Sequence, residues 1–208
     1  MKTFKLGGVH PEENKLSAGA VVETLPLPEK VCIPVSQSLG APSKVVVEKG
    51  ELVKTGQLIA KGESFISSNV HASVSGKVVK IDEVIDASGY RRQAVFIDVI
   101  GDEWVENIDR TPALVSEITA TKDDIVKKIN EMGIVGLGGA TFPSHIKLMV
   151  PEGKKAQYLL INGVECEPYL TSDHRLMLER GNEMLVGIKI LMKGLDVTKA
   201  YIGIERNK

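Results

Sequence analysis

Residues 136–147 read GLGGATFPSHIK, and this glycine segment is the most informative stretch of the chain. Three glycines in four positions let backbone amides approach a ligand without an intervening side chain. Pro143 suits the first turn of a helix, so we expect the glycines to precede a helix N-terminus, which favours an anion such as phosphate. Lys147 would add a charge-assisted contact one turn later. The segment predicts a nucleotide-binding loop.

The glycine segment matches neither of the two common phosphate-binding motifs. No Lys-Ser or Lys-Thr pair follows the glycines, as a P-loop would require. The dinucleotide fingerprint is also incomplete, because Thr141 stands where a third glycine would follow Gly136 and Gly138. Spacing alone therefore leaves a simple tight turn as an alternative.

The residues around this segment predict an α/β domain over 119–208. Ile125, Ile129 and Met132 share one face of a helix. Thr121, with Asp124 three residues later, can cap the N-terminus of this helix, and Gly133 can end it. Downstream, we expect a strand at 158–161, a helix capped by Ser172, a helix over 182–193 ended by Gly194, and a strand at 200–204. This order is a β-α-β unit with parallel strands.

An acidic loop, NGVECEP at residues 162–168, follows the first strand of this unit. Ligands of open α/β sheets bind at the carboxyl ends of the strands, so Asn162, Glu165 and Glu167 are candidates for ribose, flavin or carboxamide contacts. A turn with solvated glutamates is the structural alternative. No histidine is spaced to complete a metal site, and we assign Cys166 no catalytic role.

The first half of the chain predicts a different fold. Between residues 31 and 100, short β-branched runs alternate with glycine turns, which indicates a small all-β barrel or sandwich. Residues 1–30 form an irregular, proline-containing arm of the kind that wraps a neighbouring domain, and residues 101–118 form a linker. We therefore expect a two-domain α+β or α/β protein.

Composition excludes several functional classes. The 26 Lys and Arg against 27 Asp and Glu carry no basic footprint for nucleic acid. The two cysteines, Cys32 and Cys166, cannot form a zinc or iron–sulfur site, and no apolar run is long enough to span a membrane. A cytoplasmic setting fits best.

Because two parallel strands do not make a stable sheet, we expect the natural chain to continue beyond Lys208.

Three motifs together resemble a known family. The glycine segment and the acidic loop resemble the flavin- and NADH-binding subunit of respiratory complex I, and resemble the C subunit of Rnf-type ion-translocating ferredoxin:NAD oxidoreductases more closely. The opening GGVHP at residues 7–11, followed by Lys15 and by Ile33-Pro34, looks like the start of the Rnf C subunit.

This resemblance implies a set of cofactor-binding residues and no catalytic acid or base. It assigns to FMN Gly136, Gly138, Lys147, Asn162 and Glu165. It assigns to the nicotinamide dinucleotide, NAD(H), Gly139, Phe142 and Glu167. Phe142 would stack on a ring of the dinucleotide, or else plug the loop from below. Val164 replaces an aspartate of the complex I type and so removes one acceptor near the flavin.

The barrel resembles the biotinyl and lipoyl carrier fold, but its hairpin has no lysine between Gly62 and Gly76. Biotin or lipoate therefore cannot be attached there by an amide bond, and a docking role is expected.

The family further implies a protein bound peripherally at the cytoplasmic face of the membrane by the other subunits of the complex. It would exchange electrons between NADH and ferredoxin, coupled to ion translocation. Two [4Fe-4S] clusters are expected in the full-length protein but not in this segment, which alone should be inactive. The alternatives are a non-catalytic docking module of the complex and a flavoprotein of the cobalamin-reductase type.

Overall fold

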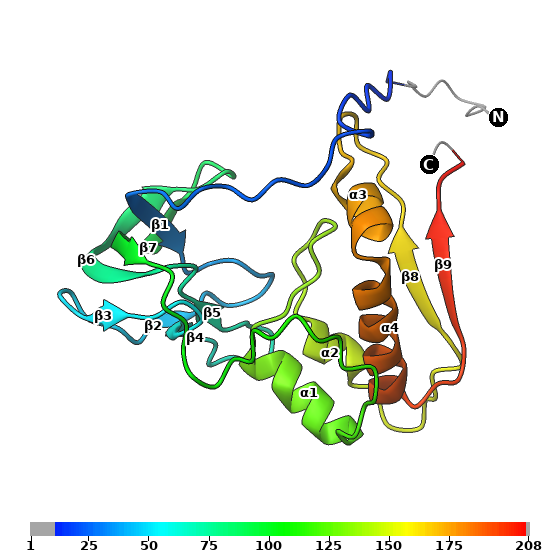
Figure 1. Ribbon diagram of the computed structural model, residues 1–208. Helices are drawn as coiled ribbons and strands as arrows, with labels where there is room; N and C mark the ends of the chain where they lie inside the picture. Colours follow the sequence, from blue (N-terminus) through cyan, green and yellow to red (C-terminus); the bar gives the residue numbers. More distant parts are fainter. Residues whose placement is uncertain (1–10, 207–208) are drawn as a thin grey trace.

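Two β-sheets form the first half of the computed structural model, which describes residues 11–206 (Figure 1). Residues 7–10 of the GGVHP motif lie outside the described part. One sheet has the order β1-β7-β6-β3 and the other β2-β4-β5. Their bounds are β1 Lys30–Pro34, β2 Lys44–Val45, β3 Leu52–Val53, β4 Leu58–Lys61, β5 Val70–His71, β6 Ser75–Ile85 and β7 Arg91–Gly101. The predicted all-β barrel or sandwich is confirmed.

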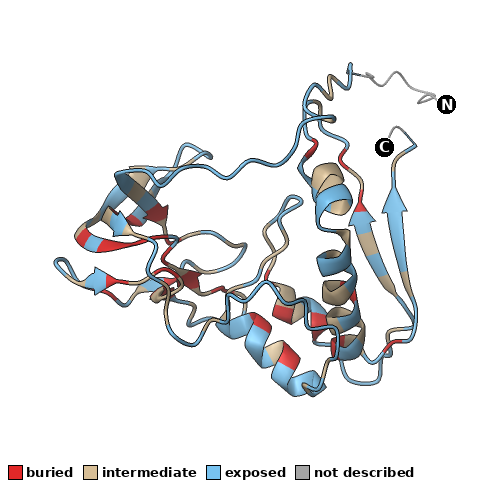
Figure 2. Ribbon diagram, in the orientation of Figure 1, coloured by how far each residue is buried: buried red, intermediate tan, exposed pale blue. Residues whose placement is uncertain are grey.

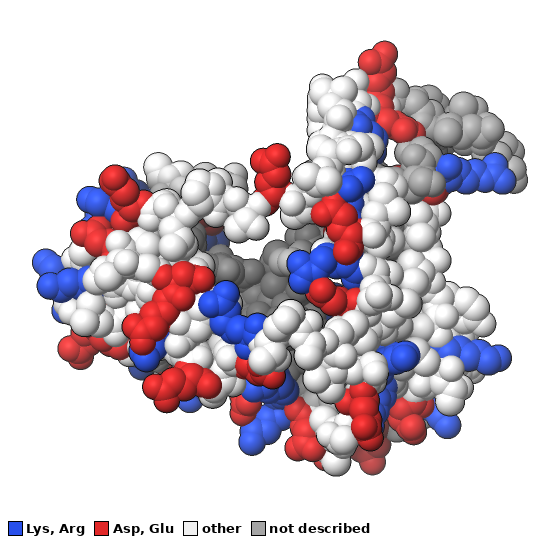
Figure 3. All heavy atoms as spheres, in the orientation of Figure 1, with Lys and Arg blue, Asp and Glu red and all other residues white. Residues whose placement is uncertain are grey.

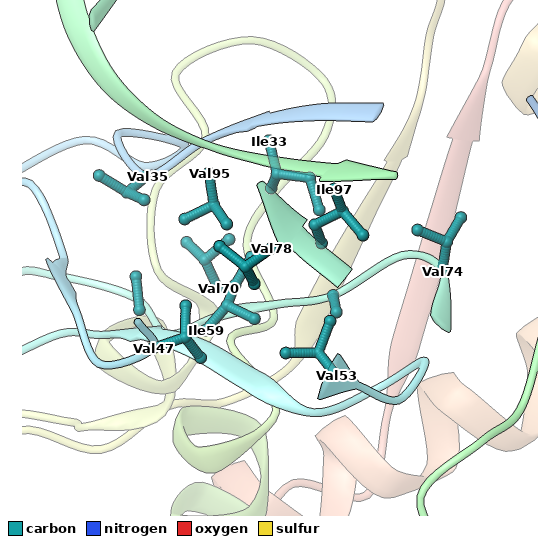
Figure 4. Packing of buried hydrophobic residues seen from close by; sticks show 12 residues of the cluster. Ile33, Val35, Val47, Val53, Ile59, Val70, Val74, Val78, Val95 and Ile97 are labelled. Carbon is teal, nitrogen blue, oxygen red and sulfur yellow. The ribbon is translucent and has the colours of Figure 1, made fainter. Parts of the chain in front are cut away.

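Small β-branched side chains fill the space between these two sheets (Figure 4). Antiparallel pairing sets Ile33 opposite Val95 and Val78 opposite Ile97, and all four side chains are buried. Full burial of one such side chain stabilises the fold by roughly 1.5–3 kcal/mol. Because residues two apart on a strand point to the same face, Val95 and Ile97 of β7 share the inward face of the sheet with Val78 of β6.

The hairpin at residues 62–69 docks the barrel onto the second half of the chain. The side-chain amide of Asn69 donates to the carbonyl of Glu131 over 3.0 Å. Gly133 packs against the Asn69 backbone so closely that a Cβ at this position would lie 2.1 Å from the Asn69 carbonyl oxygen. The hairpin that carries the modified lysine in carrier domains is here a contact surface between the two halves.

Three helices form the second core. In α1 (Lys122–Glu131), Thr121 and Asp124 form the predicted N-terminal cap, including both hydrogen bonds of a capping box. Ile125 and Ile129 of α1 pack with Leu148 of α2 (Ser144–Leu148) against α4 (Gly181–Leu195).

Gly194 does not end α4, contrary to the prediction from sequence. The helix continues to Leu195, and Asp196 adopts the left-handed conformation with φ 55°. A Cβ at position 194 would lie 3.2 Å from a methyl group of Ile125. The glycine therefore permits close packing of α4 on α1. The apolar spacing along 182–193 also predicts that Leu185 faces a core, but its side chain is 49% exposed.

Two parallel strands complete the β-α-β unit. Strand β8 (Leu159–Gly163) pairs in parallel with β9 (Ala200–Ile204), and α3 (Ser172–Glu179) and α4 form the crossover between them. The predicted parallel arrangement is confirmed. One face of the pair stays open, as the pale-blue colour of β9 in Figure 2 shows, and Leu160 is 67% exposed.

Helix α3 is capped by Glu165 rather than by Ser172. The Glu165 carboxylate accepts hydrogen bonds from the backbone N–H of Asp173 over 2.7 Å and of His174 over 3.2 Å. Thr171, the residue at the cap position, makes no side-chain capping bond. A buried carboxylate at a helix N-terminus satisfies free N–H groups and interacts favourably with the helix dipole.

We predict that Gly133→Ala destabilises the protein more than Gly153→Ala. Both glycines have positive φ, 64° and 76°, so each alanine costs about 1–2 kcal/mol from the backbone conformation. Only position 133 meets another residue, which adds about 1–3 kcal/mol of overpacking. Urea denaturation measures the difference, and equal losses would contradict the described docking of the hairpin.

We predict that Glu165→Ala lowers the free energy of unfolding by about 2 kcal/mol or more. Without the carboxylate, the N–H groups of Asp173 and His174 lose their hydrogen-bond partner at a buried position. Glu167→Ala is the matched control, since that side chain is exposed, and it should change stability by less than about 0.5 kcal/mol. Similar values for both variants in urea denaturation would exclude the capping role.

Candidate nucleotide-binding site

A cavity of about 520 Å³ lies between the glycine segment and strand β8. Loop residues 136–142 form one wall, and residues 159–162 of β8 form the other. Apolar side chains close the base of the cavity, namely Leu148, Leu191 and Leu195. The predicted neighbourhood of the glycine segment and the strand end is therefore present in the structure.

The glycines form the tip of a hairpin that rises between the barrel and α3 (Figure 1). Val135 pairs with Pro143, and the Gly136 N–H donates to the Phe142 carbonyl over 3.0 Å. The helix predicted after Pro143 is present but has only five residues. The glycines therefore line the cavity from a hairpin and not from the start of a long helix.

The barrel braces this hairpin from the other side. Thr141 has φ 48°, which is uncommon for a β-branched residue. Its carbonyl accepts a hydrogen bond from the backbone N–H of Leu39, a barrel residue, over 3.2 Å. This bond helps to keep the hairpin in its strained conformation, and it joins a loop of the barrel to the glycine segment.

Lys147 reaches from α2 into the cavity beside Gly136. Its ammonium lies 2.7 Å from where a Cβ of residue 136 would stand, so only a glycine leaves this position of the lysine undisturbed. Within residues 11–206, no carboxylate forms an ion pair with Lys147. The cavity thus contains a positive charge that can bind a phosphate.

At the carboxyl end of β8, the residues of the acidic loop separate into two groups. Asn162 lines the cavity, and its side-chain oxygen accepts from the Val164 N–H over 3.1 Å. Glu165 and Glu167 do not line it, and the Glu165 carboxylate caps α3. Asp173 lines the cavity although it was not among the residues predicted from sequence. The sequence feature that could have identified Asp173 is its position as an acidic residue in the first turn of a predicted helix.

The structure thus brings six of the eight candidate residues to one cavity: Gly136, Gly138, Gly139, Phe142, Lys147 and Asn162. Their individual contacts with FMN or NAD(H) stay predictions, as do those of Glu165 and Glu167.

The N-terminal arm contacts the far end of the acidic loop and α3. Ser17 and Thr171 share a hydroxyl hydrogen bond of 2.7 Å. The guanidinium of Arg175 donates to the Ala18 carbonyl over 3.1 Å, and the Glu179 carboxylate accepts from the Val22 N–H over 3.1 Å. The same arginine holds Glu179 and lowers the pKa of that carboxyl. Residues 17–22 of the arm therefore lie against the α/β half of the chain.

Charges of both signs are interspersed over the face that Figure 3 shows, and this face is hollowed between the barrel and the α/β half. In the described part of the chain, no three His, Cys, Asp or Glu side chains gather as a metal site would require. Nor does that part contain a helix long and apolar enough to cross a membrane.

Two known families match successive parts of the chain. Residues 2–102, which contain the arm and the barrel, match the RnfC barrel sandwich hybrid domain. Residues 129–208, which contain the glycine segment and the acidic loop, match the Nuo51 FMN-binding domain. Each match covers one of the two halves described above.

Characterised proteins match nearly the whole chain. The C subunit of a proton-translocating ferredoxin:NAD(+) oxidoreductase complex of Clostridium ljungdahlii is 48% identical, over 100% of this chain and 45% of the relative. Its Na(+)-translocating counterpart of Acetobacterium woodii is 43% identical, over 99% of this chain and 46% of the relative. The C subunit of an ion-translocating oxidoreductase complex of Rhodobacter capsulatus is 40% identical, over 100% of this chain and 40% of the relative.

The chain therefore spans slightly less than half the length of these relatives. Both matched domains occur in the order expected from the sequence, and the similar proteins carry the same subunit designation. The chain belongs to the family of C subunits of Rnf-type ion-translocating oxidoreductase complexes.

Proposed function

We propose that the cavity between the glycine segment and β8 binds FMN, and that a nicotinamide dinucleotide meets the flavin at the mouth of this cavity. The flavin supplies the electron chemistry when bound. The residues of the chain bind and orient the two cofactors. No general acid or base is needed for the exchange of a hydride between them.

The observation that carries this proposal is that one cavity contains both a lysine ammonium and an apolar base. The Lys147 ammonium suits a phosphate, whereas Leu148, Leu191 and Leu195 suit the edge of a flat aromatic ring system. A volume of about 520 Å³ lies within the usual range for ligand sites, about 300–1,000 Å³. The match to an FMN-binding domain supports the same ligand.

The place of the protein in a larger assembly belongs to the same proposal. The named relatives are subunits of ferredoxin:NAD(+) oxidoreductase complexes. By analogy, this protein would be held at the cytoplasmic face of the membrane by other subunits. It would exchange electrons between NADH and ferredoxin through iron–sulfur carriers, coupled to ion translocation.

We predict that Lys147→Met weakens FMN binding to the intact protein by about tenfold or more, because a charge-assisted hydrogen bond to the phosphate is lost. Lys154→Met is the matched control, an exposed lysine outside the cavity, and should leave the dissociation constant within about twofold of wild type. Quenching of flavin fluorescence during titration measures both constants.

Two results would contradict the proposal. If the wild-type protein does not bind FMN, the non-catalytic docking module becomes the better account. If Lys147→Met and Lys154→Met bind FMN equally well, the phosphate does not lie at Lys147.

A further inference from the structure

We propose that Lys15 of the N-terminal arm is a positioning residue, which fixes the acidic loop in the shape that binds the nicotinamide dinucleotide. This inference rests on the proposed function and concerns the dinucleotide half of the same site. It joins two parts of the chain 150 residues apart, the arm and the carboxyl edge of β8.

The Lys15 ammonium makes three hydrogen bonds to the acidic loop and the residues that follow it. It donates to the carbonyls of Glu165, Glu167 and Leu170 over 2.7, 2.8 and 2.9 Å. A lysine ammonium has three donors, and here each one has its own acceptor. Because all three carbonyls must point at the same ammonium, these bonds restrict the path that the backbone can take from residue 165 to residue 170.

The backbone next to these carbonyls is in an unfavourable conformation that the arm stabilises. Tyr169 has φ 71°, in the left-handed region that a bulky side chain rarely adopts. Its N–H donates to the carbonyl of Glu13, also in the arm, over 2.9 Å. Such a conformation persists only where surrounding contacts hold it, and Glu13 and Lys15 supply those contacts from one short segment.

The arm does not depend on Lys15 for its attachment. The bonds that link Ser17 to Thr171, Ala18 to Arg175 and Val22 to Glu179 lie beyond the acidic loop, on α3 and its start. We expect these bonds to remain when Lys15 is replaced. Removal of the ammonium is therefore expected to free the loop while the arm stays docked.

The loop bound by Lys15 connects two residues that line the cavity, Asn162 and Asp173. Glu167, the residue proposed to contact the dinucleotide, lies in the middle of the bound stretch. The glycine segment and Lys147, which are proposed to hold FMN, line the cavity on the side opposite β8, and no hydrogen bond joins them to residues 11–30 of the arm. The Glu165 carboxylate, also assigned to the flavin, is held by the start of α3 and not by Lys15. Loss of Lys15 should thus affect the dinucleotide more than the flavin.

The experiment compares Lys15→Met with Ser17→Ala in the intact protein. The second variant removes an arm contact of similar length that does not touch the acidic loop. FMN affinity is measured by fluorescence titration, and NAD⁺ affinity of the FMN-loaded protein by calorimetry. We expect Lys15→Met to weaken NAD⁺ binding about tenfold while FMN affinity changes less than about twofold, and Ser17→Ala to change neither by more than about twofold.

Lys15→Arg provides a second, conservative variant that also serves if Lys15→Met does not fold. It keeps the charge, but its planar guanidinium cannot direct donors at three convergent carbonyls. We expect it to weaken NAD⁺ binding about threefold or more.

Unchanged NAD⁺ affinity in Lys15→Met and Lys15→Arg would overturn the inference, as would an equal loss of FMN and NAD⁺ affinity. A wild-type protein that binds neither cofactor would instead refute the proposed function.

Discussion

Glu165 is the residue on which the arrangement at the carboxyl end of β8 depends, because both its side chain and its backbone carbonyl are held by other parts of the chain. Its buried carboxylate caps α3, and its carbonyl accepts a hydrogen bond from Lys15 of the arm. A buried carboxylate is costly unless its oxygens are hydrogen-bonded, so the loop must pass where the start of α3 can satisfy it. Glu165 therefore ties the loop that follows β8 to both α3 and the arm.

The barrel has a supporting role that its carrier-like fold does not suggest. Its hairpin docks onto α1 through Asn69 and Gly133, and another of its loops holds Thr141 of the glycine segment. A fold that in carrier proteins presents a mobile modified lysine here supports the glycine segment from outside the cavity, through Leu39. Lys15 of the arm contacts the loop that follows β8, the strand that forms the other wall.

Features that depend on local patterns could be predicted from the sequence. Thr121 and Asp124 capped α1 as expected, and the apolar runs marked β8 and β9. Prediction failed where a residue's partner is distant. Gly194 read as a helix stop because its contact with Ile125 cannot be seen in sequence, and the Glu165 cap lies seven residues before the helix residue Ser172 that it contacts. Lys15 belonged to a recognised motif, yet its role depends on carbonyls 150 residues away.

If this chain brings a flavin and a nicotinamide together in one site, NADH must be able to reduce the bound FMN. Anaerobic addition of NADH to the FMN-loaded intact protein, followed by the absorbance of the oxidised flavin, tests this. We predict loss of that absorbance, with recovery when an electron acceptor is added. Stable FMN binding with no bleaching by excess NADH would contradict it, since the flavin site would then be present without the dinucleotide site beside it.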